Sequence, residues 1–170
     1  MSDIRPSITD VVGIQDFAVL YKWKIVFSKV PAGLDKYLGG LLNLYALSSE
    51  YPKFSEEEIE TTMHGKKVYQ AGMRTYDPIT ITFIENNSAI IQKFIKAWAA
   101  LINTPNEEGQ KAKKDYVCQI QLSPLKADGG NLASYNLVNC WMQTHTIGNP
   151  DGSANETIKP EITLRFDYFD

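Results

Sequence analysis

Two histidines and two cysteines are the side chains of this sequence best suited to acid–base, nucleophilic or metal chemistry. His64 and His145 are isolated from each other, and Cys118 and Cys140 are the two thiols. A metal site in a small domain needs several Cys, His or carboxylate ligands at close spacing, which the sequence does not offer. A cysteine nucleophile beside His145 would need a supporting motif, and buried inert cysteine is commoner. We therefore expect no catalytic residue and no metal site.

Glycine pairs and acidic runs are the remaining candidates for a cofactor or ion site. Gly39-Gly40 and Gly129-Gly130 lack both the pattern of a phosphate-binding loop and a helix after it. The Ser48–Glu50 segment and the acidic run that begins at Glu56 lack the ligand spacing of a calcium loop. The sequence therefore predicts neither a bound cofactor nor an enzyme.

Composition predicts a single domain over residues 1–170. The chain is 44% hydrophobic and has a formal net charge of −3, so it can bury a core but lacks the basic surface of a typical nucleic-acid binder. No apolar run reaches the roughly 20 residues that span a membrane. The N-terminal sequence MSDIRPSITD has no export signal, so we expect reduced cysteines and synthesis in a cytoplasm. Residues 1–18, approximately, have no periodicity and are predicted to form an arm.

One strand and one helix give the strongest periodic signals. Ile79, Ile81 and Phe83 alternate with threonines, which predicts a strand with one buried face. Residues 90–102 predict an amphipathic helix, with N-cap candidates at residues 86–88 (Asn86, Asn87 and Ser88). The apolar side of this helix includes Ile90, Ile91, Phe94, Ile95, Trp98, Leu101 and Ile102, of which Ile91, Phe94 and Trp98 are the predicted packing residues.

The rest of the chain consists mostly of predicted strands. They cover roughly residues 20–27, 41–47, 116–122, 137–147 and 161–169. In the last of them, Ile162, Leu164, Phe166 and Tyr168 are expected to share one face. No alternation of strands and helices suggests a parallel sheet. The predicted fold is therefore mainly β, an antiparallel β-sandwich or open barrel flanked by a single α-helix.

Residues 56–71 predict a hairpin that turns at His64-Gly65. Its sides are unusually polar for a core hairpin, with four glutamates before the turn and two lysines after it. Two interpretations fit the composition. One is an ordinary solvated hairpin, and the other is an extended arm that docks on another copy of the chain.

The order of several short motifs resembles the tail tube proteins of contractile-tailed bacteriophages. That family has an AG-x-R-T-[FY]-D segment after a hairpin, as in residues 71–77 here, followed by a T-x-T strand, a short acidic or Asn-rich link and a helix ending in K-F-x-x-W. Lys93-Phe94 and Trp98 match the helix ending. Trp141, the turn at residues 149–152 and the strand at 161–170 match the C-terminal pattern. The resemblance runs from about residue 41 onward, and the loops at 31–40 and 126–131 depart from it.

The resemblance implies a structural virion protein. Such proteins form hexameric rings that stack head to tail into the inner tail tube, through which viral DNA is ejected into the host cell. The implied partners are other copies of the chain, the tail sheath protein, baseplate tube proteins and the tail terminator, in a virion tail assembled in the bacterial host cytoplasm. One alternative is a baseplate tube initiator or the inner tube of a contractile injection system. A further alternative is an unrelated intracellular β-sandwich binding module.

The resemblance favours the docking interpretation of the hairpin. The candidates for inter-ring or subunit contact are Glu57, Glu58, Glu60, Met63, His64, Lys66, Lys67, Arg74, Tyr76 and Asp77. Six copies at −3 each would give a ring a formal charge of −18. DNA is therefore expected to pass a neutral or acidic lumen without specific binding, with Lys66, Lys93 and Lys96 at contacts or on the outer face.

Overall fold

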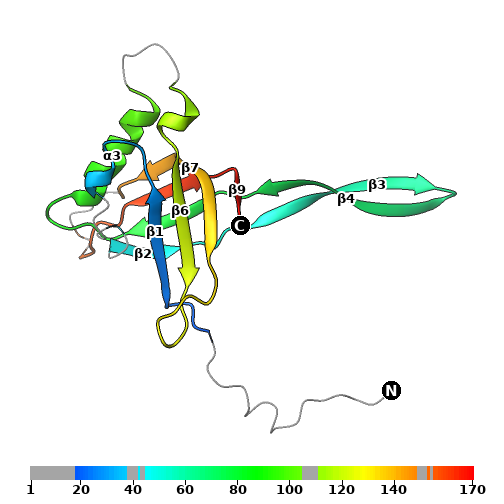
Figure 1. The fold of residues 1–170 in the computed structure, drawn as a ribbon, viewed down its shortest axis with the longest axis horizontal. Coiled ribbons are helices and arrows are strands. Elements are labelled where there is room, and N and C mark those ends of the chain that lie inside the picture. The colour runs from blue at the N-terminus through cyan, green and yellow to red at the C-terminus, as the bar shows by residue number, and fades with distance from the viewer. Residues whose placement is uncertain (1–17, 38–41, 43–44, 105–110, 149–152, 154) are drawn as a thin grey trace, which may run out of the picture.

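In the part of the chain that the structure describes, an antiparallel sheet has one long helix packed against it, and a long hairpin projects from it (Figure 1). The computed structural model describes residues 18–37, 42, 45–104, 111–148, 153 and 155–170. The predicted arm up to residue 17, the Gly39-Gly40 pair and the turn at 149–152 lie outside the described residues.

The strands of the sheet are arranged in the order β1-β6-β7-β8-β5-β2, and β9 also pairs with β7. All of these pairs are antiparallel. The helix is α3, Ile90–Ile102. This architecture confirms the predicted fold class, mainly antiparallel β with one helix. The strand bounds are β1 Trp23–Lys29, β2 Ala46–Ser49, β5 Ile79–Phe83, β6 Cys118–Pro124, β7 Tyr135–Thr146, β8 Glu161–Arg165 and β9 Tyr168–Phe169.

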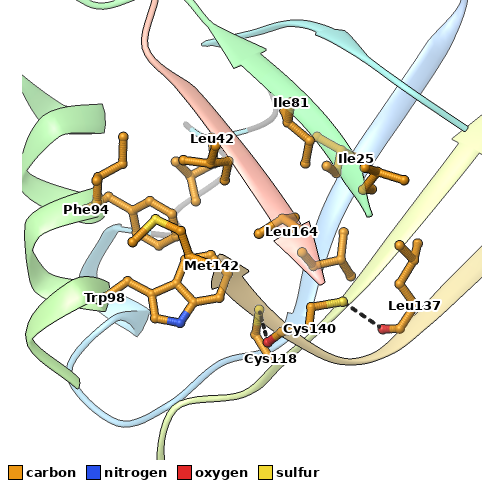
Figure 2. Close-up of a cluster of buried hydrophobic side chains, with 14 of the residues drawn as sticks. Ile25, Leu42, Ile81, Phe94, Trp98, Cys118, Leu137, Cys140, Met142 and Leu164 are labelled. Atoms are coloured by element: carbon orange, nitrogen blue, oxygen red, sulfur yellow. Dashed lines mark hydrogen bonds between the residues drawn. The ribbon is translucent and has the colours of Figure 1, made fainter. Parts of the chain in front are cut away.

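The core lies between the sheet and α3. Ile79, Ile81 and Phe83 of β5 are buried, as their alternation predicts. On α3, Ile91, Phe94, Ile95 and Trp98 are buried, so the three predicted packing residues face the core. Figure 2 shows the side chains of Phe94 and Trp98 among residues from strands that are distant in sequence. The Trp98 indole N–H donates to the backbone oxygen of Tyr116 at 2.8 Å, which satisfies its one polar group.

The start of α3 differs from the prediction. Its N-cap residue is Ala89, which has a left-handed backbone (φ 52°) and makes no side-chain cap. The Glu85 carboxylate caps the helix instead, accepting the backbone N–H groups of Ile91 (3.2 Å) and Gln92 (2.9 Å). A carboxylate at this end also interacts favourably with the helix dipole. The expected caps at 86–88 are therefore wrong, because the chain folds back and brings Glu85 to the helix end.

β7 is long enough to belong to both halves of the sheet. Its first half pairs with β6, and its second half, from Trp141 onward, pairs with β8. Asn139 lies at the change of direction and has a positive φ of 55°. Its side-chain amide donates to Asp167 at 2.8 Å, and Asp167 also accepts Lys113 Nζ at 2.5 Å. These two contacts fix the bend.

The sequence predicts one strand over residues 161–169, but the structure has two strands there. β8 ends at Arg165, and β9 pairs with the first half of β7 after an interruption at Phe166-Asp167. Ile162, Leu164 and Phe166 are buried, but Tyr168 is half exposed. The expectation that Tyr168 shares their face is therefore wrong, because the interruption changes the alternation.

Two early strands are displaced from their predicted positions. β1 begins at Trp23 rather than near residue 20, and β2 begins at Ala46 rather than near residue 41. For β1, the alternation of apolar residues in the sequence also includes Tyr21, which lies before the start of the strand. For β2, Leu42 is buried and helical, which shows that an apolar run of this length does not distinguish a strand from a helix.

Candidate assembly surface

The hairpin formed by β3 (Phe54–Met63) and β4 (Lys66–Tyr76) extends away from the body of the protein (Figure 1). It is longer than the 56–71 segment expected from the sequence. All ten residues of β3 are exposed, and nearly all of β4 is exposed too. A two-stranded hairpin is at best marginally stable alone in water, so a hairpin of this length needs further support.

Local backbone geometry explains why the hairpin turns where it does. His64 and Gly65 both have positive φ, 49° and 76°, which is the pattern of a two-residue type I′ turn. Met63 and Lys66 are the first pair after this turn. Gly72 has a separate constraint, because a Cβ there would lie 3.0 Å from the backbone oxygen of Glu57, at the register shift opposite that residue.

The strand register divides the hairpin side chains between two faces. Phe54, Glu56, Glu58, Glu60 and Thr62 point to one face, since side chains alternate along a strand. Their register partners include Arg74, Tyr69 and Lys67. We call this the charged face. The other is the apolar face, and its members include Ile59, Thr61, Met63, Lys66 and Val68.

Ion pairs within the hairpin occupy the charged face. Arg74 binds Glu56 through Nε at 3.0 Å and through a second guanidinium nitrogen. The Arg74 guanidinium also lies 4.3 Å from the centre of the Phe54 ring. Lys67 Nζ is 2.9 Å from Glu60 Oε1. These charges are therefore compensated inside the subunit, at modest gain because solvent screens exposed pairs.

An aromatic cluster joins the hairpin to the body. The Tyr76 ring contacts Phe166 and Phe169, with centroids 6.1 and 5.6 Å away, and the Phe54 ring lies 6.2 Å from that of Phe169. The backbone N–H of Asp77 donates to the backbone oxygen of Lys53 at 3.2 Å, which joins the two strands at the base of the hairpin. The orientation of the hairpin is thus fixed at its base, while its outer part contacts nothing in the subunit among the described residues.

The predicted contact residues fall into three places. His64 occupies the turn, Tyr76 and Asp77 lie at the base, and the others lie along the two strands. Met63, Lys66 and Glu57 lie on the apolar face. The register shift places Glu57 opposite both Gly72 and Met73. Those on the charged face are Glu58, Glu60, Lys67 and Arg74.

Sequence reasoning missed Phe54 and Glu56, which position Arg74. Counting back from the His64-Gly65 turn would have paired Glu56 with residue 73 rather than Arg74. The register shift between Glu56 and Glu58 moves the pairing by one residue. Gly72 is the signal in the sequence that could have corrected this pairing, since an isolated glycine inside a strand pattern often marks a β-bulge.

The candidates for chemistry are not brought together. His64 is exposed at the hairpin turn and His145 is exposed near the end of β7. Cys118 and Cys140 are free, buried register partners on β6 and β7. Burial raises the pKa of Cys140 to about 12 and that of Cys118 well above its ordinary value, so both remain uncharged thiols near neutral pH.

The part of the chain that the structure describes lacks two further types of feature. It contains no group of three or more His, Cys, Asp or Glu side chains that could hold a metal ion. It also contains no helix with the length and apolar character required to cross a membrane.

Sequence and structure comparisons point to one group of proteins. The sequence model of a family described as phage tail tube protein matches residues 16–168. No curated protein matches the chain. Among solved structures, the chain is similar to a protein in the tube-terminating cap of the anti-feeding prophage, with a TM-score of 0.68, 17% identity, and 98% and 97% of the two chains covered. It is also similar to a protein in the sheath-tube complex of an extracellular contractile injection system in the extended state, with a TM-score of 0.62, 17% identity, and 96% and 97% covered.

Proposed function

Because the chain belongs to the phage tail tube protein family, we propose that its copies form hexameric rings that stack head to tail into the inner tube of a contractile tail. The tube is the conduit for viral DNA on its way into the host cell. The role is structural and needs no catalytic group. Its place is the virion tail, after assembly in the host cytoplasm.

The observation that carries the proposal is the projecting hairpin. None of the 21 residues of β3 and β4 is fully buried within the subunit, and, among the described residues, contacts with the body are confined to the base of the hairpin. Ordering an exposed segment of this length costs conformational entropy that its own few contacts repay poorly. A contact on another copy repays that cost. A hairpin on one side of the subunit and its receptor on another make a heterologous contact, which propagates as a filament when it does not close.

Sheet edges support the ring. β1 and β2 stand at the two ends of the strand order. An edge strand in a monomer is a site for unwanted pairing, and pairing with the next subunit removes it. A ring of such pairs closes into a large barrel with a water-filled interior. The exposed and half-buried polar residues of β5 and β8 then have a solvent-facing role.

The proposed partners follow from the proteins of similar fold. One of them belongs to a sheath-tube complex and another to a tube-terminating cap. A third, with a TM-score of 0.66 and 10% identity, belongs to a baseplate. We infer a sheath protein around the tube, baseplate tube proteins at one end and a terminator at the other.

Shortening the hairpin tests the proposal. Removing Thr62, Met63, Lys66 and Lys67 while keeping His64-Gly65 makes Thr61 and Val68 the closing pair. Because two register pairs are removed, the remaining residues keep their places on the charged face and the apolar face, and the type I′ turn is kept. The variant should fold with an unchanged far-ultraviolet circular dichroism spectrum but sediment as small species under conditions in which the parent protein forms tubes.

A matched control changes the turn without shortening the arm. His64→Asn keeps the length and suits the positive φ at that position. It should assemble like the parent protein. Tube formation by the shortened variant, at the parent's concentration dependence, would show that the hairpin is not the stacking element.

A further inference from the structure

An apolar groove lies on the body of the subunit, between the start of β1 and the β2 segment. Its volume is about 570 Å³. Leu20, Tyr21, Trp23, Leu47, Tyr51 and Leu122 provide its apolar lining. Leu20 is 83% exposed and Tyr21 is 77% exposed. Large apolar side chains clustered at such exposure mark a surface that is covered in an assembly.

The apolar face of the hairpin is the second uncovered surface. Ile59, Met63 and Val68 are each about half exposed on it. They lie along one side of the strand pair, opposite their register partners Gln70, Lys66 and Thr61. The opposite face is less suited to an apolar groove, because it carries three glutamates, two of which pair with Arg74 and Lys67 within the hairpin.

We propose that the apolar face of the hairpin of one subunit docks in this groove of a second subunit. The proposal rests on the tube function given above and identifies the two surfaces that meet. Ile59, Met63 and Val68 supply the inserted side chains, and the groove supplies the receptor.

A hairpin that docks in this groove must come from a second copy. None of the residues that line the groove belongs to the hairpin, and the hairpin extends away from the body that contains the groove (Figure 1). Self-folding of the hairpin into its own groove would require breaking the aromatic cluster of Tyr76 with Phe166 and Phe169. A second subunit needs no such change.

The charges on the two surfaces are compatible with this pairing. Lys66 and Glu57 lie on the apolar face, and Glu50 and Lys53 line the groove, so each surface offers one acidic and one basic group. The Glu50 carboxylate accepts the backbone N–H of Thr80 at 3.2 Å, which holds it in place beside β2.

Site-directed crosslinking between two populations tests the proposal. One population carries Leu47→Cys in the groove, and the other carries Ile59→Cys, Met63→Cys or Val68→Cys on the apolar face. Cys118 and Cys140 are buried, so they give little background. After mixing and treatment with a short bismaleimide, we expect a band at twice the subunit mass for at least one apolar-face variant.

The matched control places the cysteine on the charged face. Tyr69→Cys lies at a similar distance from the tip and is similarly exposed, but it points to the other side of the hairpin. The apolar-face variants should link to Leu47→Cys several-fold more than Tyr69→Cys does. Equal linking from both faces, or linking from Tyr69→Cys alone, would overturn the proposal.

A second variant separates failure of the groove from failure of the tube. Leu47→Glu, at a half-exposed position, should leave the subunit folded and remove tube assembly. If the parent protein and Leu47→Glu both form tubes, the groove assignment is wrong and the tube function stands. If the parent protein forms no tubes and no crosslink appears, both the tube function and the groove assignment fail.

Discussion

Trp98 is the largest fully buried side chain among the described residues. It is fully buried on α3, where its ring contacts Phe27 and Phe94 with centroids 6.4 and 5.6 Å away. Its indole N–H donates to Tyr116. Truncation therefore removes apolar contacts and leaves a cavity in addition to breaking a hydrogen bond.

We predict that Trp98→Ala lowers the free energy of unfolding by roughly 3–5 kcal/mol. The measurement is chemical denaturation of the shortened-hairpin variant, in which assembly does not contribute to stability. Lys96→Ala is the control, since Lys96 is exposed on the same helix and alanine is a good helix former. A Trp98→Ala effect no larger than that of the control would mean that Trp98 does not pack the core.

Asp167 gives a pH-dependent contribution to stability. Partial burial acts to raise the pKa of its carboxyl, but hydrogen bonds from Lys113 and Asn139 outweigh it and lower the pKa below the ordinary value. A depressed carboxyl pKa stabilises the fold above the unfolded-state pKa, and this stability is lost as the pH falls through the folded-state value.

Asp167→Asn should cost about 1 kcal/mol at pH 7, a small value because Lys113 and Asp167 are both partly exposed and screened by solvent. The cost should vanish under acidic conditions, where the carboxyl of the parent protein is itself protonated. Denaturation of both proteins across the acidic range measures this. A difference that stays constant with pH would contradict the charge-based role of Asp167.

Among the helices and strands, α3 is capped by a residue that lies outside the usual N-cap positions. Glu85 lies six and seven residues before the amide groups that it accepts. Glu85→Ala should therefore lower the free energy of unfolding by about 1 kcal/mol, as for loss of an ordinary cap. Asn87→Ala is the control, because Asn87 was a predicted cap but is exposed. An equal loss in both variants would contradict the cap assignment.

The sequence predicted those helices and strands whose pattern of apolar residues lies wholly within the element. The alternation of Ile79, Ile81 and Phe83 and the apolar side of α3 both required only local information. The bend of β7 did not, because Asn139, which has a positive φ, hydrogen-bonds to Asp167, a residue 28 positions away in the sequence. The split of the C-terminal segment has the same origin, since β8 and β9 each pair with a different half of β7.

The candidate surface was predictable in part for a similar reason. The His64-Gly65 turn located the hairpin, and its charged residues were visible in the sequence. Which residues share a face depends on the register shift opposite Gly72. The groove brings together residues 20–23, 47–53 and Leu122, which no local pattern connects.

For the whole molecule, the net charge bears on the proposed passage of DNA through the tube. At −3 per subunit, the proposed six-membered ring would have a formal charge of −18. Lys93 and Lys96 are exposed on the side of α3 opposite its buried residues. We expect these lysines to face outward, leaving a lumen that is neutral or acidic.

Assembled tubes should therefore show no measurable affinity for duplex DNA at physiological salt, since a basic wall would bind phosphates through counterion release. Co-sedimentation of tubes with a labelled duplex across a salt series is the measurement. Binding that is tight and falls steeply with salt would contradict the charge distribution assigned to the tube.

Electron microscopy of the purified protein is the most direct test of whether this subunit builds a tube by itself. We expect hollow tubes made of stacked rings, with six-fold rotational symmetry in averaged end views. The rings should repeat along the axis without a second protein component. Monodisperse single subunits over the whole concentration range, or closed rings that never stack, would contradict this expectation.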